Sequence, residues 1–176
     1  MFIAQEKRKN NILEYILYMW QVENIIRACK FDIKLIKSTV IAQLGLTEND
    51  KELVVEWYLD LIQQMKSQNL QQTGHLAFTR DIITELTVLH QTLLKTFQDK
   101  SYNPLYNNAK ADIYDLQKKQ PNDCTEIEAC VNGMFGLWIL KLGKKEISSQ
   151  TQQSFDRITK MLARLGKNYH EMMNEK

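Results

Sequence analysis

The sequence predicts an all-α protein: one helical domain over residues 1–176, built as a bundle of six to seven helices that run mostly up and down. Apolar residues recur in nearly every segment at the three- and four-residue spacing that places them on one helix face. The sustained apolar–polar alternation of a strand does not occur. Only six glycines and two prolines interrupt the 176 residues. A sheet protein of this size needs more turns than that, so the composition also favours helices.

Three helices are predicted before residue 70. The first covers residues 4–29 and is the most apolar, and a shorter one covers residues 32–44. Gly45 suits the position just after a helix end, because glycine adopts the left-handed backbone conformation there without strain. Thr47, followed three residues later by Asp50, resembles a capping box. A third helix is therefore expected to start at this point.

A fourth helix is predicted after a connection at residues 70–78. Thr79 is expected to cap its start, and Phe78 and Ile83 are placed to pack together across that first turn. Five apolar residues at helical spacing form its predicted buried stripe: Ile82, Leu86, Leu89, Leu93 and Phe97.

The last three helices have clear starting signals. Pro104 suits the first position of a fifth helix, because proline lacks the backbone N–H that would be unpaired there. Residues 123–126 read Asp-Cys-Thr-Glu and open a sixth helix, which is apolar on nearly all sides over residues 129–142. Ser148 or Ser149 is expected to cap the seventh helix, which ends near the C-terminus.

The charge pattern does not favour a polyanionic partner. The net charge is +2, and basic and acidic residues are interspersed. Residues 12–29 are very apolar, but Glu14, Glu23 and Arg27 interrupt them, so this segment is expected to be a core helix rather than a membrane span. The three cysteines form no CxxC pair, and the N-terminus shows no signal-peptide pattern. We therefore expect a cytoplasmic protein with reduced thiols and no membrane contact.

Two features point weakly towards nucleic acid. Residues 39–57 resemble a helix-turn-helix, but the helix that would enter the groove begins with three acidic residues, which phosphates repel. Four cations share one face of the last helix: Arg157, Lys160, Arg164 and Lys167. Interspersed cations of this kind are usually a solvated surface. The sequence therefore predicts no specific nucleic-acid binding.

The first helix carries a polar pair beside its largest apolar residues. Glu23 and Arg27 stand four residues apart in the favourable acid-then-base order, and they lie on the same side as Trp20. This helix cannot turn all its polar groups to water while burying its aromatic residues. Part of the polar set is therefore expected to be enclosed. A structural ion pair and a ligand-binding role remain alternative interpretations.

His90 lies within the apolar arc of the fourth helix. A buried imidazole needs a hydrogen-bond partner, and Glu23 or a backbone carbonyl is expected to supply it. We therefore predict one internal polar cluster of Trp20, Glu23, Arg27 and His90. A satisfied core histidine and a functional one remain open, and no nucleophile stands at helical spacing from His90. We predict no catalytic residue.

Metal and cofactor motifs do not occur in the sequence. Glu-x-x-His, His-Glu-x-x-His and paired Cys-x-x-Cys patterns are missing, and so are glycine-rich phosphate loops. We therefore expect neither a metal nor a cofactor.

Five stretches of the chain resemble a known family: residues 7–12 (KRKNNI), 15–23 (YILYMWQVE), 73–76 (TGHL), 89–90 (LH) and 144–148 (KKEIS). The family consists of small bacterial proteins and is known only as a domain of unknown function. The resemblance extends over almost the whole chain. It implies a single-domain, cytoplasmic bacterial protein, and it implies no activity, cofactor or catalytic residue.

These features favour a binding or scaffolding protein over an enzyme. The last helix carries apolar residues at alternating steps of three and four, a pattern expected of a seam inside the bundle or, alternatively, of a homodimer face. Together with the apolar first helix, it offers more hydrophobic surface than one small bundle readily covers, so we expect contact with a protein partner or a homodimer. The alternative is an enzyme or small-ligand binder that uses the polar cluster around His90, Glu23 and Arg27.

Overall fold

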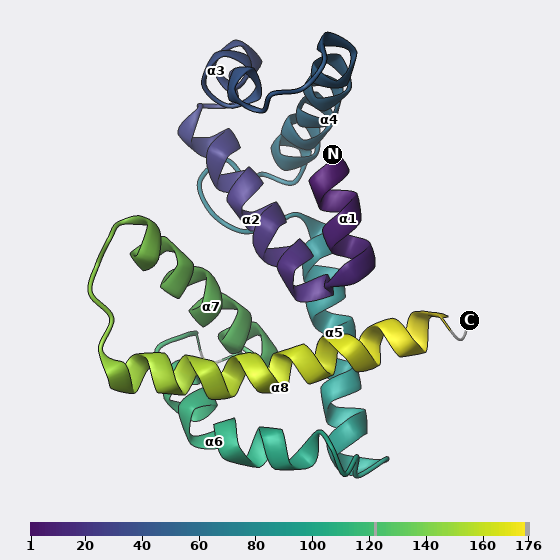
Figure 1. Ribbon diagram of the computed structural model, residues 1–176, viewed down its shortest axis with the longest axis vertical. Helices are drawn as coiled ribbons and strands as arrows, with labels where there is room; N and C mark the ends of the chain where they lie inside the picture. The colour runs from purple at the N-terminus through teal and green to yellow at the C-terminus, as the bar shows by residue number, and fades with distance from the viewer. Residues whose placement is uncertain (122, 175–176) are drawn as a thin grey trace. The chain divides into compact units, whose positions relative to one another are not determined.

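The computed structural model describes residues 1–121 and 123–174. Within them the chain forms eight α-helices, one short 3-10 helix and no strand (Figure 1). The all-α class is confirmed, and the expected number of six to seven helices is too low. The described residues group into two compact units. Unit 1 holds residues 1–10 and 14–81, and unit 2 holds residues 11–13 and those from 82 onward. The up-and-down order and the single domain stay predictions.

Unit 1 is built from the N-terminal helices. They are α1 (Phe2–Asn10), most of α2 (Ile12–Ala28), α3 (Ile33–Thr39), the 3-10 helix η1 (Ile41–Gln43), α4 (Glu48–Ser67) and the first turn of α5 (Ala77–Lys95). The predicted cap of α4 is confirmed, since the Thr47 hydroxyl accepts a hydrogen bond from the Asp50 N–H at 3.2 Å. Gly45 has φ +61°, the conformation expected of it.

The predicted first helix is two helices, because the chain breaks at Asn11. The Asn11 side chain accepts a hydrogen bond from the Leu13 N–H at 3.2 Å, as a residue at a helix start does. The Ile12 N–H donates to Nε2 of His170 at 3.2 Å. Apolar periodicity continues across this point, so only the contact with a residue 158 positions away reveals the break.

Unit 2 contains the rest of α5 together with α6 (Asn103–Gln117), α7 (Glu126–Leu142) and α8 (Ser149–Asn174). Helix α6 packs against α7 and α8, and it runs alongside α8 in Figure 1. A Cβ atom on Gly133 would lie 2.9 Å from the Leu116 side chain, so the missing side chain permits the close approach of α7 to α6. Arg157 clamps Asp112 through two hydrogen bonds of 2.7 and 2.9 Å, which tie α8 to α6.

The predicted helix starts in unit 2 are mostly confirmed. Pro104 lies at the start of α6, and the Ser148 hydroxyl accepts the Thr151 N–H at 3.2 Å before α8. Helix α7 starts slightly later than expected, because Thr125 rather than Asp123 is its capping residue.

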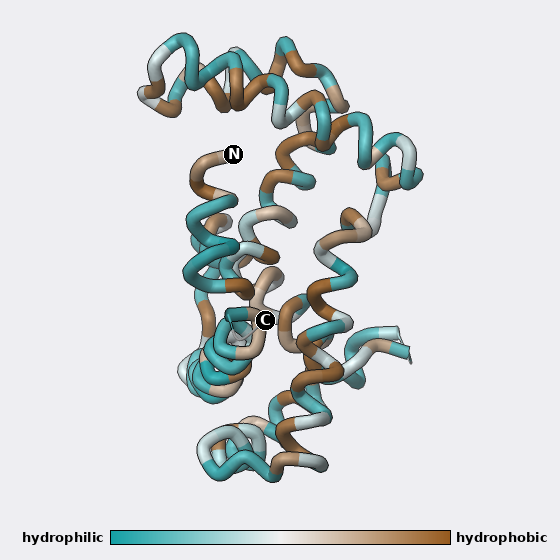
Figure 2. The backbone as a smooth tube through the Cα atoms, turned by 90° about the vertical axis from the view of Figure 1, so that its right-hand side faces the viewer, coloured by the Kyte–Doolittle hydropathy of each residue, from teal (hydrophilic) through white to brown (hydrophobic). Residues whose placement is uncertain are grey.

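Apolar and polar residues alternate along the helices at short intervals (Figure 2), and the apolar ones supply the cores. The apolar pattern of α8 is used inside unit 2, where Ile158, Leu162, Leu165 and Tyr169 are buried. Phe97 contradicts the predicted stripe of α5, since it is 68% exposed. Helix α5 ends at Lys95, and Gln98 turns the chain with φ +46°. Every helix in the described residues falls short of the length and apolarity that crossing a bilayer requires.

Candidate functional site

Glu23 is the centre of a polar network in unit 1. Its side chain is fully buried, and one carboxylate oxygen lies 2.6 Å from Nδ1 of His75. The other oxygen accepts the backbone N–H of Leu76 at 3.0 Å. The buried charge is thus matched by two hydrogen bonds, which a carboxylate out of water requires.

Arg27 completes this network, and Trp20 covers it. The Arg27 guanidinium donates to the backbone carbonyls of Leu70 (3.1 Å) and Gly74, and it lies 3.9 Å from the Glu23 carboxylate. The Trp20 ring stacks on the His75 ring, with centroids 3.8 Å apart. The expected Glu23–Arg27 pair is therefore present beside Trp20, and its partners hold the loop that precedes α5.

The same contacts explain where α5 starts. The Leu76 N–H donates to Glu23, and the Ala77 N–H donates to the Gln68 side chain at 2.8 Å. These unpaired donors of the helix start are satisfied by residues from α2 and from the end of α4. The prediction that Thr79 caps α5 is wrong, because Thr79 lies inside the first turn with its hydroxyl bonded to the Leu76 carbonyl.

His90 is the centre of a second network, in unit 2. The imidazole is fully buried, with Nδ1 2.7 Å from the Tyr102 hydroxyl and Nε2 2.9 Å from a Glu126 oxygen. The Tyr106 hydroxyl donates to the other oxygen of Glu126 at 3.0 Å. Side chains from α5, α6 and α7 are thereby joined around one imidazole.

Hydrogen bonds engage both ring nitrogens of His90. The hydrogen bond from His90 holds the pKa of Glu126 below its usual range, and burial raises the pKa of Tyr106 to about 12. The ionised carboxylate accepts the Nε2 proton, and Nδ1 is paired with the Tyr102 hydroxyl. Neither ring nitrogen is therefore open to a substrate. Burial also raises the pKa of the nearby Cys130 thiol, which makes it a poor nucleophile.

His90 has hydrogen-bond partners other than the Glu23 carboxylate or backbone carbonyl expected for it. Trp20, Glu23 and Arg27 are brought together, and the fourth member of that group is His75. His90 is buried and hydrogen-bonded as expected, and its two partners come from its own unit. A buried imidazole needs satisfied nitrogens, and Tyr102 and Glu126 meet that need locally.

Four network residues were missed from the sequence: His75, Tyr102, Tyr106 and Glu126. His75 is a loop residue, but it follows Gly74, whose φ of +88° marks a tight turn beside the buried charge. Tyr102 directly precedes α6, and no local sequence pattern indicates what its ring contacts. No three His, Cys, Asp or Glu side chains of residues 1–121 and 123–174 gather as a metal ion would require.

A groove of about 690 Å³ lies between α5 and α8 of unit 2, and we call it the α5–α8 groove. Its apolar residues are Val88, Leu89, Leu93, Phe97, Met172 and Met173. Val88 and Phe97 are 61% and 68% exposed, although both are large apolar residues. The volume falls in the usual range for a binding site, and exposed apolar side chains mark such sites.

The charged residues of the groove are mostly acidic. Glu85, Asp99 and Glu171 contribute three carboxylates, and Arg164 is the one basic residue of the lining. The Asn168 amide nitrogen and Arg164 Nε are buried and make no hydrogen bond to the described residues. Asn168 is only 8% exposed. A buried donor without a partner costs about 1–3 kcal/mol, so both atoms lower the stability of unit 2.

Comparison with known proteins places the whole chain in one family. A family model described as "Domain of unknown function (DUF4924)" matches residues 1–176. No curated protein and no solved structure matches the chain. The family resemblance expected from the sequence is thereby confirmed, and it extends over all 176 residues. The protein belongs to the DUF4924 family, a domain of unknown function.

Proposed function

We propose that this protein is a non-enzymatic binding protein that takes a basic amphipathic helix of a protein partner in the α5–α8 groove. The observation that carries the proposal is the groove itself, which combines exposed Val88 and Phe97 with a surplus of carboxylates. A scaffolding role requires a surface of this kind, because the chain must hold a partner without transforming it.

The shape of the groove supports a helix as the occupant. On α5 the lining follows the i, i+4 row Thr84, Val88, Thr92, and on α8 it follows Arg164 and Asn168. Rows of this spacing leave a furrow into which the ridge of another helix packs. Residues 84–95 of α5 extend over about 18 Å at 1.5 Å per residue, the length of about three helical turns.

The chemistry of the groove supports a basic, apolar-faced helix. Of the three carboxylates, Glu171 pairs with Lys167, and Glu85 and Asp99 favour lysine and arginine at the edges of the partner. Met172 and Met173 supply flexible, polarisable side chains that adapt to the partner's apolar face.

The test is equilibrium binding of a fluorescent peptide of about 14 residues, with leucine at i, i+3, i+4 and i+7 and lysine elsewhere. Saturable one-to-one binding at micromolar concentration is expected from fluorescence anisotropy, and it should weaken as salt screens the carboxylates. The matched control peptide replaces every lysine with glutamate, and its binding should be at least tenfold weaker.

Two variants test whether the peptide binds in the groove. Phe97→Lys should weaken binding of the basic peptide at least tenfold. Tyr114→Lys, which alters an equally exposed aromatic residue (59%) outside the groove, should leave it within twofold. Equal binding of the two peptides, or equal effects of the two substitutions, would contradict the proposal.

A homodimer is proposed on a different surface. The predicted seam on α8 is occupied inside unit 2, but Ile139, Leu140 and Leu142 at the end of α7 are 45%, 47% and 63% exposed. Three exposed apolar residues at one helix end support self-association. Light scattering at micromolar concentration should return twice the chain mass of 20.7 kDa, and Leu140→Glu should return the monomer. A monomeric parent protein would end this proposal.

The enzyme or small-ligand alternative is favoured by one observation, on His75 rather than on His90. Buried Glu23 holds Nδ1 of His75, while Nε2 makes no hydrogen bond to the described residues and the side chain is 27% exposed. A carboxylate-oriented imidazole of this kind can act as a base.

We also propose a cytoplasmic location, which the three free thiols support. The pairing of Arg157 with Asp112 and of Lys167 with Glu171 supports the absence of specific nucleic-acid binding.

A further inference from the structure

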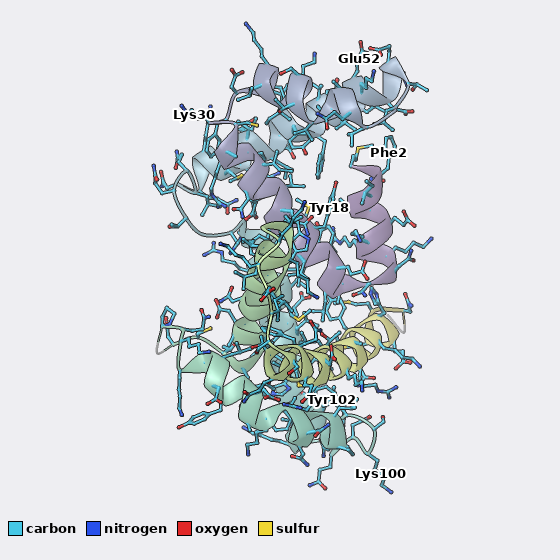
Figure 3. The ribbon with its side chains drawn as sticks, turned by 60° about the vertical axis from the view of Figure 1, so that its left-hand side comes forward. Phe2, Tyr18, Lys30, Glu52, Lys100 and Tyr102 are labelled. Atoms are coloured by element: carbon cyan, nitrogen blue, oxygen red, sulfur yellow. The ribbon has the colours of Figure 1, made fainter. Side chains whose placement is uncertain are left out.

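Unit 1 contains a pocket of its own, which has no part in the function proposed for the α5–α8 groove. It has a volume of about 280 Å³ and lies between α1, α2, the segment around η1 and α4. Six of its lining residues carry the argument: Tyr18, Gln21, Val22, Leu44, Trp57 and Tyr58. Figure 3 labels Phe2 on α1 and Tyr18 on α2, which both line this pocket. We call it the unit 1 pocket.

The lining is mostly apolar and has no charged side chain. Four aromatic residues, Phe2, Tyr18, Trp57 and Tyr58, supply ring faces and edges, and aliphatic residues and the neutral amide of Gln21 supply the rest. Burial lowers the pKa of the Met1 amino group to about 6, so that group is mostly uncharged at neutral pH. An ionic ligand would lose its hydration here without gaining an opposite charge, which is unfavourable.

Tyr58 supplies a polar group without a partner. The side chain is only 4% exposed and its hydroxyl makes no hydrogen bond to the residues that the structure describes, but the oxygen itself is not fully enclosed. Burial raises the pKa of this hydroxyl, and burial also raises the pKa of Tyr18, so both stay protonated. A hydroxyl that keeps its proton and stays accessible can donate to an acceptor in the pocket.

We propose that the unit 1 pocket is a binding site for a small, uncharged aromatic molecule that carries one hydroxyl or carbonyl oxygen. The rings of Tyr18 and Trp57 favour an aromatic body, because aromatic pairs gain more than their buried area alone provides. The Tyr58 hydroxyl donates to the oxygen of the ligand. The volume, near the lower end for ligand pockets, limits the molecule to about two fused rings.

The experiment compares 2-naphthol with naphthalene, measured by calorimetry on the full chain at neutral pH. The parent protein should bind one 2-naphthol per chain, more tightly than naphthalene. Tyr58→Phe should weaken 2-naphthol binding about fivefold, the loss expected for one hydrogen bond, and should leave naphthalene binding unchanged. Equal loss for both probes would overturn the assigned role of Tyr58.

Two exposed leucines provide a matched pair of variants. Leu44 lines the pocket and is 42% exposed, so Leu44→Trp should fill its entrance and weaken 2-naphthol binding at least tenfold. Leu53 is 37% exposed on α4 outside the lining, so Leu53→Trp should leave binding within twofold. Absence of saturable binding, or equal binding by the two variants, would overturn the proposal. Phe97→Lys should not change 2-naphthol binding, which separates this site from the groove.

Discussion

The two histidine networks have the same pair of residue types with opposite burial. In unit 1 the carboxylate of Glu23 is fully buried and the His75 side chain is 27% exposed. In unit 2 the imidazole of His90 is fully buried and the Glu126 side chain is 27% exposed. In unit 1 the interior member collects the larger set of partners, since Glu23 binds a backbone N–H, an imidazole and a guanidinium. In unit 2 His90 and Glu126 have two partners each.

This difference shows that burial, rather than residue type, determines what each network can do. The polar atoms of the buried member are all engaged in hydrogen bonds, because an unsatisfied interior group is costly. The partly exposed member can keep a polar atom that is open to a further group. In unit 1 His75 Nε2 therefore stays open, as the enzyme or small-ligand alternative requires, whereas in unit 2 the exposed member is a carboxylate that already accepts two hydrogen bonds.

The largest effect is expected for Glu23→Ala. This change leaves the Arg27 guanidinium without its carboxylate and the Leu76 N–H without an acceptor, so the free energy of unfolding should fall by about 3–5 kcal/mol. Urea denaturation measures it. The control is Glu14→Ala, which removes an exposed carboxylate and should cost about 0.5 kcal/mol or less. Similar losses of unfolding free energy in the two variants would show that the buried Glu23 carboxylate does not stabilise the fold through its network.

An intermediate effect is expected for His90→Leu. The Tyr102 hydroxyl, which is fully buried, would lose its partner, and the free energy of unfolding should fall by about 2–3 kcal/mol. Adding Tyr102→Phe removes the orphaned hydroxyl and should recover about 1 kcal/mol. If the double variant loses the sum of the two single losses instead, the two side chains are not coupled.

The smallest effect is expected for the pH dependence of the His90 network. The pKa of Glu126 in the folded protein lies below its ordinary value of 4.5. The ionised carboxylate therefore adds stability that is complete above pH 4.5 and is lost as the pH falls through the lowered pKa. The stability gap between the parent protein and Glu126→Gln should narrow from pH 6 to pH 3. A stability difference that stays constant over this range would show that ionisation of Glu126 does not stabilise the His90 network.

Much of the fold could be predicted because local signals determine helices. The Thr47 cap, the Pro104 start and the Ser148 cap each depend on residues within one turn. The errors occur where a residue far away in the sequence determines a helix boundary. His170 takes the N–H that breaks the first helix, and Glu23 takes the N–H that starts α5.

The candidate sites were predicted only in part for the same reason. Enclosure of Glu23 follows from the composition of its own helix, so it was predictable. The partners of His90 depend on how α5, α6 and α7 pack, and no local pattern encodes that arrangement. The α5–α8 groove follows from the end of α5 at Lys95, which leaves Phe97 exposed where helical spacing had placed it in a core.

The rate at which the buried Cys130 thiol is labelled can report local opening of unit 2. Only a thiolate reacts with alkylating reagents, and Cys130 is fully buried with its pKa raised by that burial. The labelling rate of Cys130 therefore reports how often α7 separates from its neighbours rather than the chemistry of the thiol. Cys124 lies at the near end of the same segment and is only partly buried, with its pKa raised to about 11. The ratio of the two rates distinguishes fraying at the start of α7 from opening of its centre.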